Sequence, residues 1–233
     1  MADLTGTLVE FPSNGTKGSG YLSVPAAGEG PGVVVLQEWW GLNDQIKEVC
    51  DRYAESGFVA LAPDVYRGVV TAEPDEAMKL MLQLNIEQAA KDMVGAVDFL
   101  AGHEAVTSST VGVTGYCMGG GLALWLATLR PTLVGAVVPY YGVLPWPAAQ
   151  PDYSLLQAKV QGHYAELDDS ASPEAVKKLE DELRGLGVDC EFFIYPGTEH
   201  AFSNHHRPEV HHAEHTDTAW QRTTDFFRAT LTP

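Results

Sequence analysis

The sequence predicts an α/β protein in which helices cover both faces of a mostly parallel central sheet, with an antiparallel hairpin at its start. Three observations lead to this class. Short runs of β-branched and apolar residues recur along the chain, as in strands buried on both faces. Segments with helical periodicity alternate with these runs, which favours parallel pairing. A glycine-rich turn at 115–121 joins one such run to a helix-forming segment.

The expected strands follow from these runs in order. Residues 6–12 and 20–25 are predicted to pair as the hairpin, through a loop that contains Asn14-Gly15 and is longer than two residues. The run 32–37, Gly-Val-Val-Val-Leu-Gln, is typical of a buried central strand. Further strands are expected at residues 58–62, 111–114, 134–141, 159–163 and 190–195.

The expected helices are supported by end signals and by apolar stripes. Asn43 is a good N-cap for the first helix, and Gly57 is a residue type that ends helices. Ser172-Pro173-Glu174 combines a cap, a proline and an acid, which is typical of a helix start. Helices are expected at residues 43–56, 73–84, 87–100, 121–127, 172–186 and 216–231.

Composition limits the kind of protein and its partners. A chain of 233 residues is expected to form a single domain, 1–233. The net charge of −17 argues against nucleic acid as a partner, because binding it requires a basic surface. No apolar run is long enough to cross a membrane, and no signal peptide is evident. Three cysteines, an odd number, argue against a disulfide framework, so we expect a cytoplasmic protein.

The turn Gly115-Tyr-Cys117-Met-Gly119 carries the chemistry. A nucleophile between two glycines at a strand-to-helix corner is the nucleophile elbow of α/β-hydrolases, with cysteine in place of the usual serine. The glycines allow a turn in which the nucleophile has a strained backbone. The helix N-terminus favours an anion, so Cys117 is predicted to be a nucleophile.

A thiol nucleophile needs a base, and the base needs an orienting acid. His200 follows the last expected strand, which is where this fold places its histidine. The preceding strand is followed by Glu166, Asp168 and Asp169. Both aspartates qualify as the acid, and Glu166 is a weaker third candidate.

The segment after the strand 32–37 is Glu38-Trp39-Trp40. In this fold the corresponding loop supplies one oxyanion N–H, so Trp39 and Met118 are the expected backbone donors. A carboxylate beside such a site is unusual because it opposes negative charge, so Glu38 requires an explanation.

Together these residues resemble the dienelactone hydrolase family, the carboxymethylenebutenolidases. The resemblance is carried by Gln37-Glu38-x-x-Gly41, by Ala-Pro-Asp-Val-Tyr at 62–66, by the elbow, by 163–168 and by His-Ala-Phe at 200–202. It implies hydrolysis of a small ester or lactone through Cys117, His200 and Asp168, with an acyl-thioester intermediate and no cofactor. It also implies that Glu38 holds the resting thiol and releases it when substrate binds.

The sequence departs from the family pattern at the residues that bind the substrate's carboxylate. Familiar members have one arginine in the region equivalent to 73–84 and another just after His-x-Phe, and this chain has Lys79 and Ser203-Asn204 there. The substrate-binding candidates are Trp40, Tyr66, Arg67, Lys79, Phe202 and Arg207. Alternatives are a broad carboxylesterase or thioesterase with the same triad, or a non-catalytic binding protein on this fold.

Five histidines lie between residues 205 and 215, namely His205, His206, His211, His212 and His215. They suggest Zn²⁺ or Ni²⁺. No cysteine or carboxylate framework with metal spacing accompanies them, so we expect no functional metal site. The expected assembly is a monomer or a small homo-oligomer.

Overall fold

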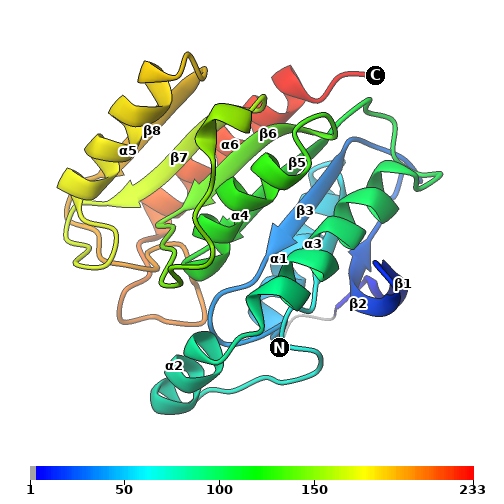
Figure 1. Cartoon of the computed structure of the whole chain (residues 1–233), viewed down its shortest axis with the longest axis horizontal. Helices are drawn as coiled ribbons and strands as arrows, with labels where there is room; N and C mark the ends of the chain where they lie inside the picture. The colour runs from blue at the N-terminus through cyan, green and yellow to red at the C-terminus, as the bar shows by residue number, and fades with distance from the viewer. Residues whose placement is uncertain (1–3) are drawn as a thin grey trace.

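The computed structural model describes residues 4–233. Its strands form one sheet in the order β1-β2-β4-β3-β5-β6-β7-β8 (Figure 1). β2 pairs antiparallel with β1 and with β4, whereas the pairs from β4 to β8 are parallel. The strands are β1 Thr7–Ser13, β2 Thr16–Ser23, β3 Gly32–Leu36, β4 Val59–Pro63, β5 Val111–Tyr116, β6 Val134–Tyr140, β7 Lys159–Ala165 and β8 Cys190–Tyr195. The predicted α/β class with a mostly parallel sheet is confirmed.

The hairpin loop is tighter than predicted. Ser13 pairs directly with Thr16, so the loop consists of only two residues. Asn14 has φ 40° and Gly15 has φ 90°, the left-handed conformations that such a short turn requires. The prediction of a longer loop is wrong because the first half of β2 is polar and gave no strand signal, although it pairs fully with β1.

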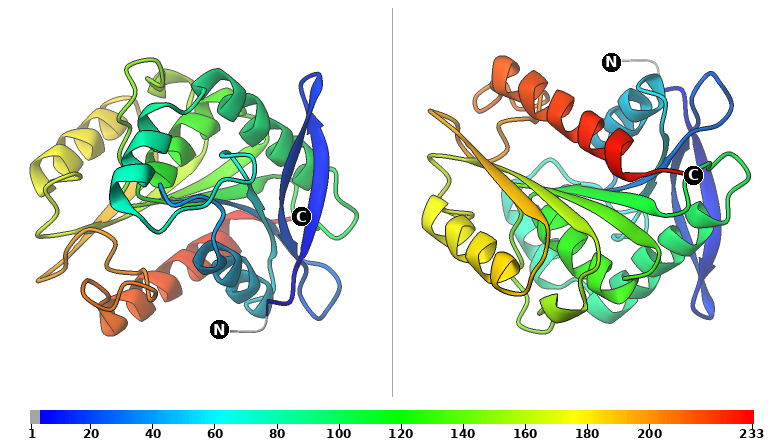
Figure 2. Two further views of the ribbon diagram at one scale, coloured as in Figure 1. Left: turned by 90° about the horizontal axis from the view of Figure 1, so that it is seen from below. Right: turned by 90° about the horizontal axis from the view of Figure 1, so that it is seen from above.

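Helices cover both faces of the sheet, with α1 and α6 on one face and α3, α4 and α5 on the other (Figure 2). α2 lies beyond the end of the sheet toward which the parallel strands run (Figure 1). The helices are α1 Asp44–Glu55, α2 Pro74–Leu82, α3 Ile86–Ala101, α4 Met118–Leu129, α5 Pro173–Gly185 and α6 Ala213–Thr230. Among residues 4–233, no helix combines the length and the apolar character that a membrane crossing requires.

Side chains of the central strands alternate between two apolar layers. On β3, Val33 and Val35 join the layer under α1 and α6, while Val34 and Leu36 join the layer under α3 and α4. All four are at most 1% exposed. Burial of each such side chain contributes about 1.5–3 kcal/mol. The middle of the sheet is therefore a rigid base for the loops at its carboxyl edge.

Two helices, α1 and α6, begin in the loops that follow β3 and β8. Asn43 caps α1 as predicted, accepting a hydrogen bond from the N–H of Ile46 at 3.2 Å. α6 begins at Ala213, earlier than the predicted Thr216, because His212 is its N-cap. The Nδ1 atom of His212 accepts from the N–H of His215 at 3.4 Å. Histidine is an uncommon cap, so no clear start signal is visible in the sequence at that position.

Candidate active site

Cys117 lies at the junction of β5 and α4 and is the N-cap of that helix. Its backbone has φ 55° and ψ −122°, a left-handed conformation that costs energy for a residue with a side chain. Its N–H donates to the carbonyl of Tyr140 at 3.1 Å, and its carbonyl accepts from the N–H of Gly120 at 2.9 Å. The chain on both sides of the cysteine is thus anchored, and this holds the strained residue in place.

The elbow glycines are required by close backbone packing. A Cβ atom on Gly119 would collide with the carbonyl oxygens of Leu36 and Gln37 at the end of β3. A Cβ atom on Gly115 would collide with the backbone of Gly119. The absence of side chains therefore allows α4 to begin directly against the central strands, which brings Cys117 to their carboxyl edge.

Met118 is the first residue of α4, and Trp39 follows β3 by three positions. Within the described part of the chain, we find no hydrogen bond from the N–H of either residue. The first N–H groups of a helix have no acceptor within the helix, so that of Met118 is available to an anion. Both predicted oxyanion donors thus remain uncommitted to other protein groups.

Asp168 and His200 form a direct pair in loops after β7 and β8. Asp168 Oδ2 lies 2.6 Å from His200 Nδ1. The other oxygen, Oδ1, accepts from the N–H groups of Ser170 at 2.7 Å and Ala171 at 2.9 Å. The side chain of Asp168 is fully buried, while Asp169 is exposed. Of the two aspartates that sequence left open, the structure brings Asp168 to the histidine.

Glu166, the third acid candidate, has a different partner. Its Oε2 accepts a hydrogen bond from the N–H of Gly197 at 2.8 Å. This contact ties the loop after β7 to the loop after β8, which carries His200. Glu166 therefore supports the position of the histidine loop from outside the pocket.

The electrostatics of His200 favour its protonated form. Burial is the largest influence and by itself lowers the pKa of this imidazole. Hydrogen bonds and electrostatic interactions with Asp168 and Cys117 outweigh burial and raise the pKa of His200 to about 10. Asp168 is the counterpart: burial opposes its ionised form, but His200 and two backbone N–H groups lower the pKa of its carboxyl. The pair therefore carries opposite charges at neutral pH.

Glu38 is 2% exposed and lies beside the thiol. Its Oε2 accepts from Asn204 Nδ2 at 3.1 Å, and its Oε1 accepts from Tyr141 Oη at 3.4 Å. Burial raises the pKa of Glu38, and the charge of His200 and the bond from Asn204 offset part of this rise. Sequence reasoning missed Asn204 and Tyr141, since neither belongs to the quoted motifs.

The thiol opens into a pocket of about 190 Å³ at the carboxyl edge of the sheet. One wall comes from α2, whose Met78 and Met81 line the pocket together with Cys117. Sequence reasoning missed both, although their spacing of three residues places them on one helix face. The pocket is lined by Glu38, Trp39, Met78, Met81, Cys117, Val143, Ser170, His200, Ala201 and Arg207.

Arg207 is the one arginine or lysine among the described residues that line this pocket. Its Nε donates to Glu209 Oε1 at 2.8 Å, and its side chain is one-third exposed. Arg207 and Trp39 also line an adjoining surface hollow together with Trp40. Tyr66 lines neither of these two pockets: it is 7% exposed, and its hydroxyl contacts the sulfur of Met118 at 3.4 Å.

Three substrate-binding candidates lie away from the pocket, and these predictions need correction. Phe202 is fully buried between the rings of Tyr141 and Tyr195, because its aromatic side chain completes the core beneath the loop. Lys79 is exposed, because the face of α2 that turns toward the pocket carries methionines.

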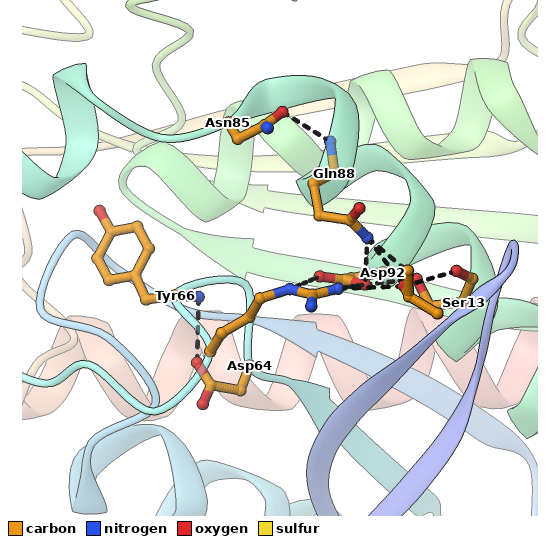
Figure 3. A network of polar contacts seen from close by, with 8 residues as sticks. Ser13, Asp64, Tyr66, Asn85, Gln88 and Asp92 are labelled. Atoms are coloured by element: carbon orange, nitrogen blue, oxygen red, sulfur yellow. Dashed lines mark hydrogen bonds and ion pairs between the residues drawn. The ribbon is translucent and has the colours of Figure 1, made fainter.

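Arg67 is the third, and it is held by Asp92 of α3. Its Nε donates to Oδ2 at 3.0 Å and its Nη2 to Oδ1 at 2.8 Å, a two-pronged pair. Asp92 is 1% exposed and also accepts from Ser13 Oγ and Gln88 Nε2 (Figure 3). Arg67 therefore neutralises a buried carboxylate that also binds Ser13 of the hairpin. Its guanidinium stabilises the contact between the hairpin and α3 and does not face substrate.

The histidine-rich segment is divided between two places. His205 and His206 both contact Glu48 of α1, with Nε2···Oε2 distances of 2.7 and 2.8 Å. His212 and His215 stack on each other at the start of α6, with ring centroids 4.2 Å apart. The sequence shows no carboxylate framework with metal spacing near these histidines, and the fold brings in Glu48, which is 157 residues away from His205.

Comparison with known proteins identifies the family of the chain. The model of the dienelactone hydrolase family matches residues 19–231. Protein usf of Aquifex pyrophilus is 38% identical over 97% of this chain and 100% of that protein. A protein of Aquifex aeolicus, named provisionally as a carboxymethylenebutenolidase, is 34% identical over 97% of this chain and 99% of its own.

Solved structures extend the likeness to the fold. A dienelactone hydrolase-like promiscuous phosphotriesterase from metagenomic libraries superposes with a TM-score of 0.85 at 25% identity, covering 97% of this chain and 98% of that one. The family model spans the sheet from β2 and both loops that carry the Asp168–His200 pair. The chain therefore belongs to the dienelactone hydrolase family.

Proposed function

We propose that this protein hydrolyses a small ester or lactone, with Cys117 as nucleophile, His200 as acid and base, and Asp168 as the orienting acid. The observation that carries the proposal is the Asp168–His200 pair at 2.6 Å, in a pocket that the sulfur-bearing elbow also lines. Family membership makes the protein a carboxylic ester hydrolase. We further propose that residues 1–233 act as one catalytic domain in the cytoplasm, without a cofactor.

The first half of the reaction forms an acyl-thioester. The Cys117 thiolate attacks the acyl carbon, and the new oxyanion accepts from the N–H groups of Trp39 and Met118. The imidazolium of His200 then gives its proton to the departing alkoxide. A raised pKa suits this step, because the histidine must still hold its proton when the leaving group needs it.

The second half releases the acid. Once the sulfur is acylated, its negative charge is gone, and one of the influences that raise the pKa of His200 disappears with it. The neutral imidazole can then accept a proton from water, which attacks the thioester. Asp168 keeps Nδ1 engaged throughout, so Nε2 stays directed at the reacting atoms.

The pocket suggests the substrate. Its walls are largely apolar, with Met78, Met81 and Val143, and a volume of about 190 Å³ suits a small acyl group. Arg207 supplies a cation at the rim and is the proposed partner of a substrate carboxylate, as in a dienelactone. Because this is one arginine at a partly exposed site, uncharged esters remain the alternative substrates for the same triad.

The test measures hydrolysis of a dienelactone and of p-nitrophenyl acetate by the wild type, Cys117→Ala and Arg207→Gln. We expect Cys117→Ala to abolish turnover of both esters and Arg207→Gln to reduce kcat/KM about tenfold for the dienelactone alone, the usual loss with one charged hydrogen bond. Equal rates for the wild type and Cys117→Ala would overturn the proposed nucleophile. An equal effect of Arg207→Gln on both esters would remove its role in carboxylate binding.

A further inference from the structure

A three-residue cluster, Glu48, His205 and His206, lies on the surface between α1 and the loop that follows His200. One ligating atom of each residue lies within 4.8 Å of the other two. The Nε2 atoms of both imidazoles converge on the same oxygen of Glu48, at 2.7 and 2.8 Å. The two rings are almost perpendicular, with centroids 4.6 Å apart. The active site described above uses none of these side chains.

We propose that Glu48, His205 and His206 bind one divalent transition-metal ion of the Zn²⁺ class. Two imidazole nitrogens and one carboxylate oxygen are a common ligand set for Zn²⁺, with water completing the coordination. Imidazole also suits Co²⁺ and Ni²⁺, whereas Mg²⁺ and Ca²⁺ prefer oxygen ligands alone. The chemistry therefore selects a transition metal over an alkaline-earth ion.

The geometry requires only a small adjustment. Metal bonds of about 2.0–2.2 Å at tetrahedral angles separate ligand atoms by about 3.3–3.5 Å. Each Nε2 must then withdraw from Glu48 Oε2 by about 0.6 Å, with the metal ion taking the position of the two N–H protons. The imidazoles are 47% and 42% exposed and the carboxylate 15%, so the rings can turn while α1 holds the glutamate fixed.

Two hydrogen bonds through Asn204 connect this cluster to the active site. The backbone N–H of His206 donates to Asn204 Oδ1 at 3.0 Å. The amide nitrogen of Asn204 donates in turn to Glu38 Oε2 at 3.1 Å. A metal ion at His206 would therefore fasten the loop that carries Asn204 and Arg207 to α1. The metal ion would stabilise the position of this loop and would not take part in catalysis, since the site lies outside the thiol pocket.

The experiment uses the full-length protein stripped of metal by a chelator, in a Cys117→Ala background so that the thiol cannot be a ligand. Zn²⁺ is titrated by calorimetry into this protein and into the same protein with Glu48→Gln, His206→Ala or His215→Ala. His215 serves as the matched control, because it is a histidine of the same segment that stacks on His212 outside the cluster. Circular dichroism of each metal-free variant checks that it is folded.

We expect one equivalent of Zn²⁺ to bind, with its affinity reduced at least about tenfold by Glu48→Gln and by His206→Ala and unchanged by His215→Ala. The melting temperature should rise with Zn²⁺ in the background protein and in the His215 variant only. Co²⁺ should give visible absorption that is lost in the same two variants. No binding at about 0.1 mM Zn²⁺, or binding that keeps its affinity in either the Glu48 or the His206 variant, would overturn the site.

Discussion

Asn204 Nδ2 donates a hydrogen bond to the buried carboxylate of Glu38 at 3.1 Å, and these two residues are 166 positions apart in the chain. This bond holds the carboxyl group of Glu38 beside Cys117, where burial raises its pKa. A carboxylate with a raised pKa favours folding at low pH, and that contribution is lost as the pH rises through the folded-state pKa. When ionised, Glu38 therefore lowers the stability of the fold.

Replacement of this carboxylate should separate stability from activity. Glu38→Gln is expected to raise the melting temperature at pH 7 by about 2–4 °C, the shift that about 1 kcal/mol produces in a chain of this size. It should also lower kcat/KM, because an amide cannot hold and release the Cys117 thiol in the way that the family resemblance implies for Glu38. Calorimetric melting from pH 4 to 8 measures the difference. An advantage of the variant that does not grow with pH would contradict the assigned destabilisation.

The pH dependence of catalysis should reflect the Asp168–His200 pair. Since the pKa of His200 is about 10 in the free enzyme, kcat/KM should keep its high value at neutral pH and fall only near pH 10. Asp168→Asn removes one of the influences that raise this pKa, so the basic limb should move to lower pH. Initial rates of an uncharged ester, measured at subsaturating concentration from pH 5 to 11, give both profiles. An unchanged basic limb in Asp168→Asn would argue against the pair as its origin.

The same raised pKa has a consequence for stability. The His200 imidazolium contributes stability that is complete below its ordinary pKa of 6.5 and is lost as the pH rises through about 10. We therefore expect His200→Ala to destabilise the protein more at pH 6 than at pH 11. Urea unfolding at both pH values measures this difference.

Arg67 should matter for folding and not for turnover. Arg67→Ala leaves the buried Asp92 without its two-pronged partner. Because the arginine side chain is 45% exposed, the expected loss is about 1–3 kcal/mol, below that for a fully buried pair. Well below the melting temperature, kcat/KM should equal that of the wild type. A selective loss of kcat/KM with unchanged stability would return Arg67 to the substrate site.

The elbow should not tolerate a single added methyl group. Gly119→Ala would push α4 away from the end of β3 and displace Cys117, and a displacement of about 1 Å can cost about 100-fold in kcat. Gly185→Ala is the matched control, because a Cβ atom at that helix position meets nothing within 4 Å. The two variants are compared by kcat and by circular dichroism. Similar kcat values for both would refute the close-packing argument.

The sequence predicts those parts of the proposed site that depend on local rules. The elbow around Cys117 depends on glycines a few residues apart, and the strand order brings the segments after β7 and β8 to the same edge. His200 and its acid could therefore be predicted: the strand ends left Asp168 and Asp169 open, the family resemblance favoured Asp168, and the loop conformation brings Asp168 to His200. Nothing in the spacing of the two residues decides that choice.

The remaining parts depend on contacts between distant segments. Glu48 and His205, Arg67 and Asp92, and Asn204 and Glu38 meet only because whole loops and helices have particular orientations. Charge and residue type identify such groups as candidates, but they do not select the partner. Arg67 illustrates this limit: an arginine near the site in sequence neutralises a carboxylate on another element.

The two methionines of α2, Met78 and Met81, form one wall of the pocket, here called its ceiling, from two thioether side chains. Their unbranched side chains change shape by bond rotation, so the space above the sulfur nucleophile can adapt to different acyl groups while the sheet stays rigid. Met78 is 43% exposed, which leaves it open to oxidants. Conversion to the sulfoxide would place a polar oxygen where substrate meets hydrocarbon. Peroxide damage at this ceiling would be reversible by sulfoxide reduction, unlike full oxidation of the thiol below it.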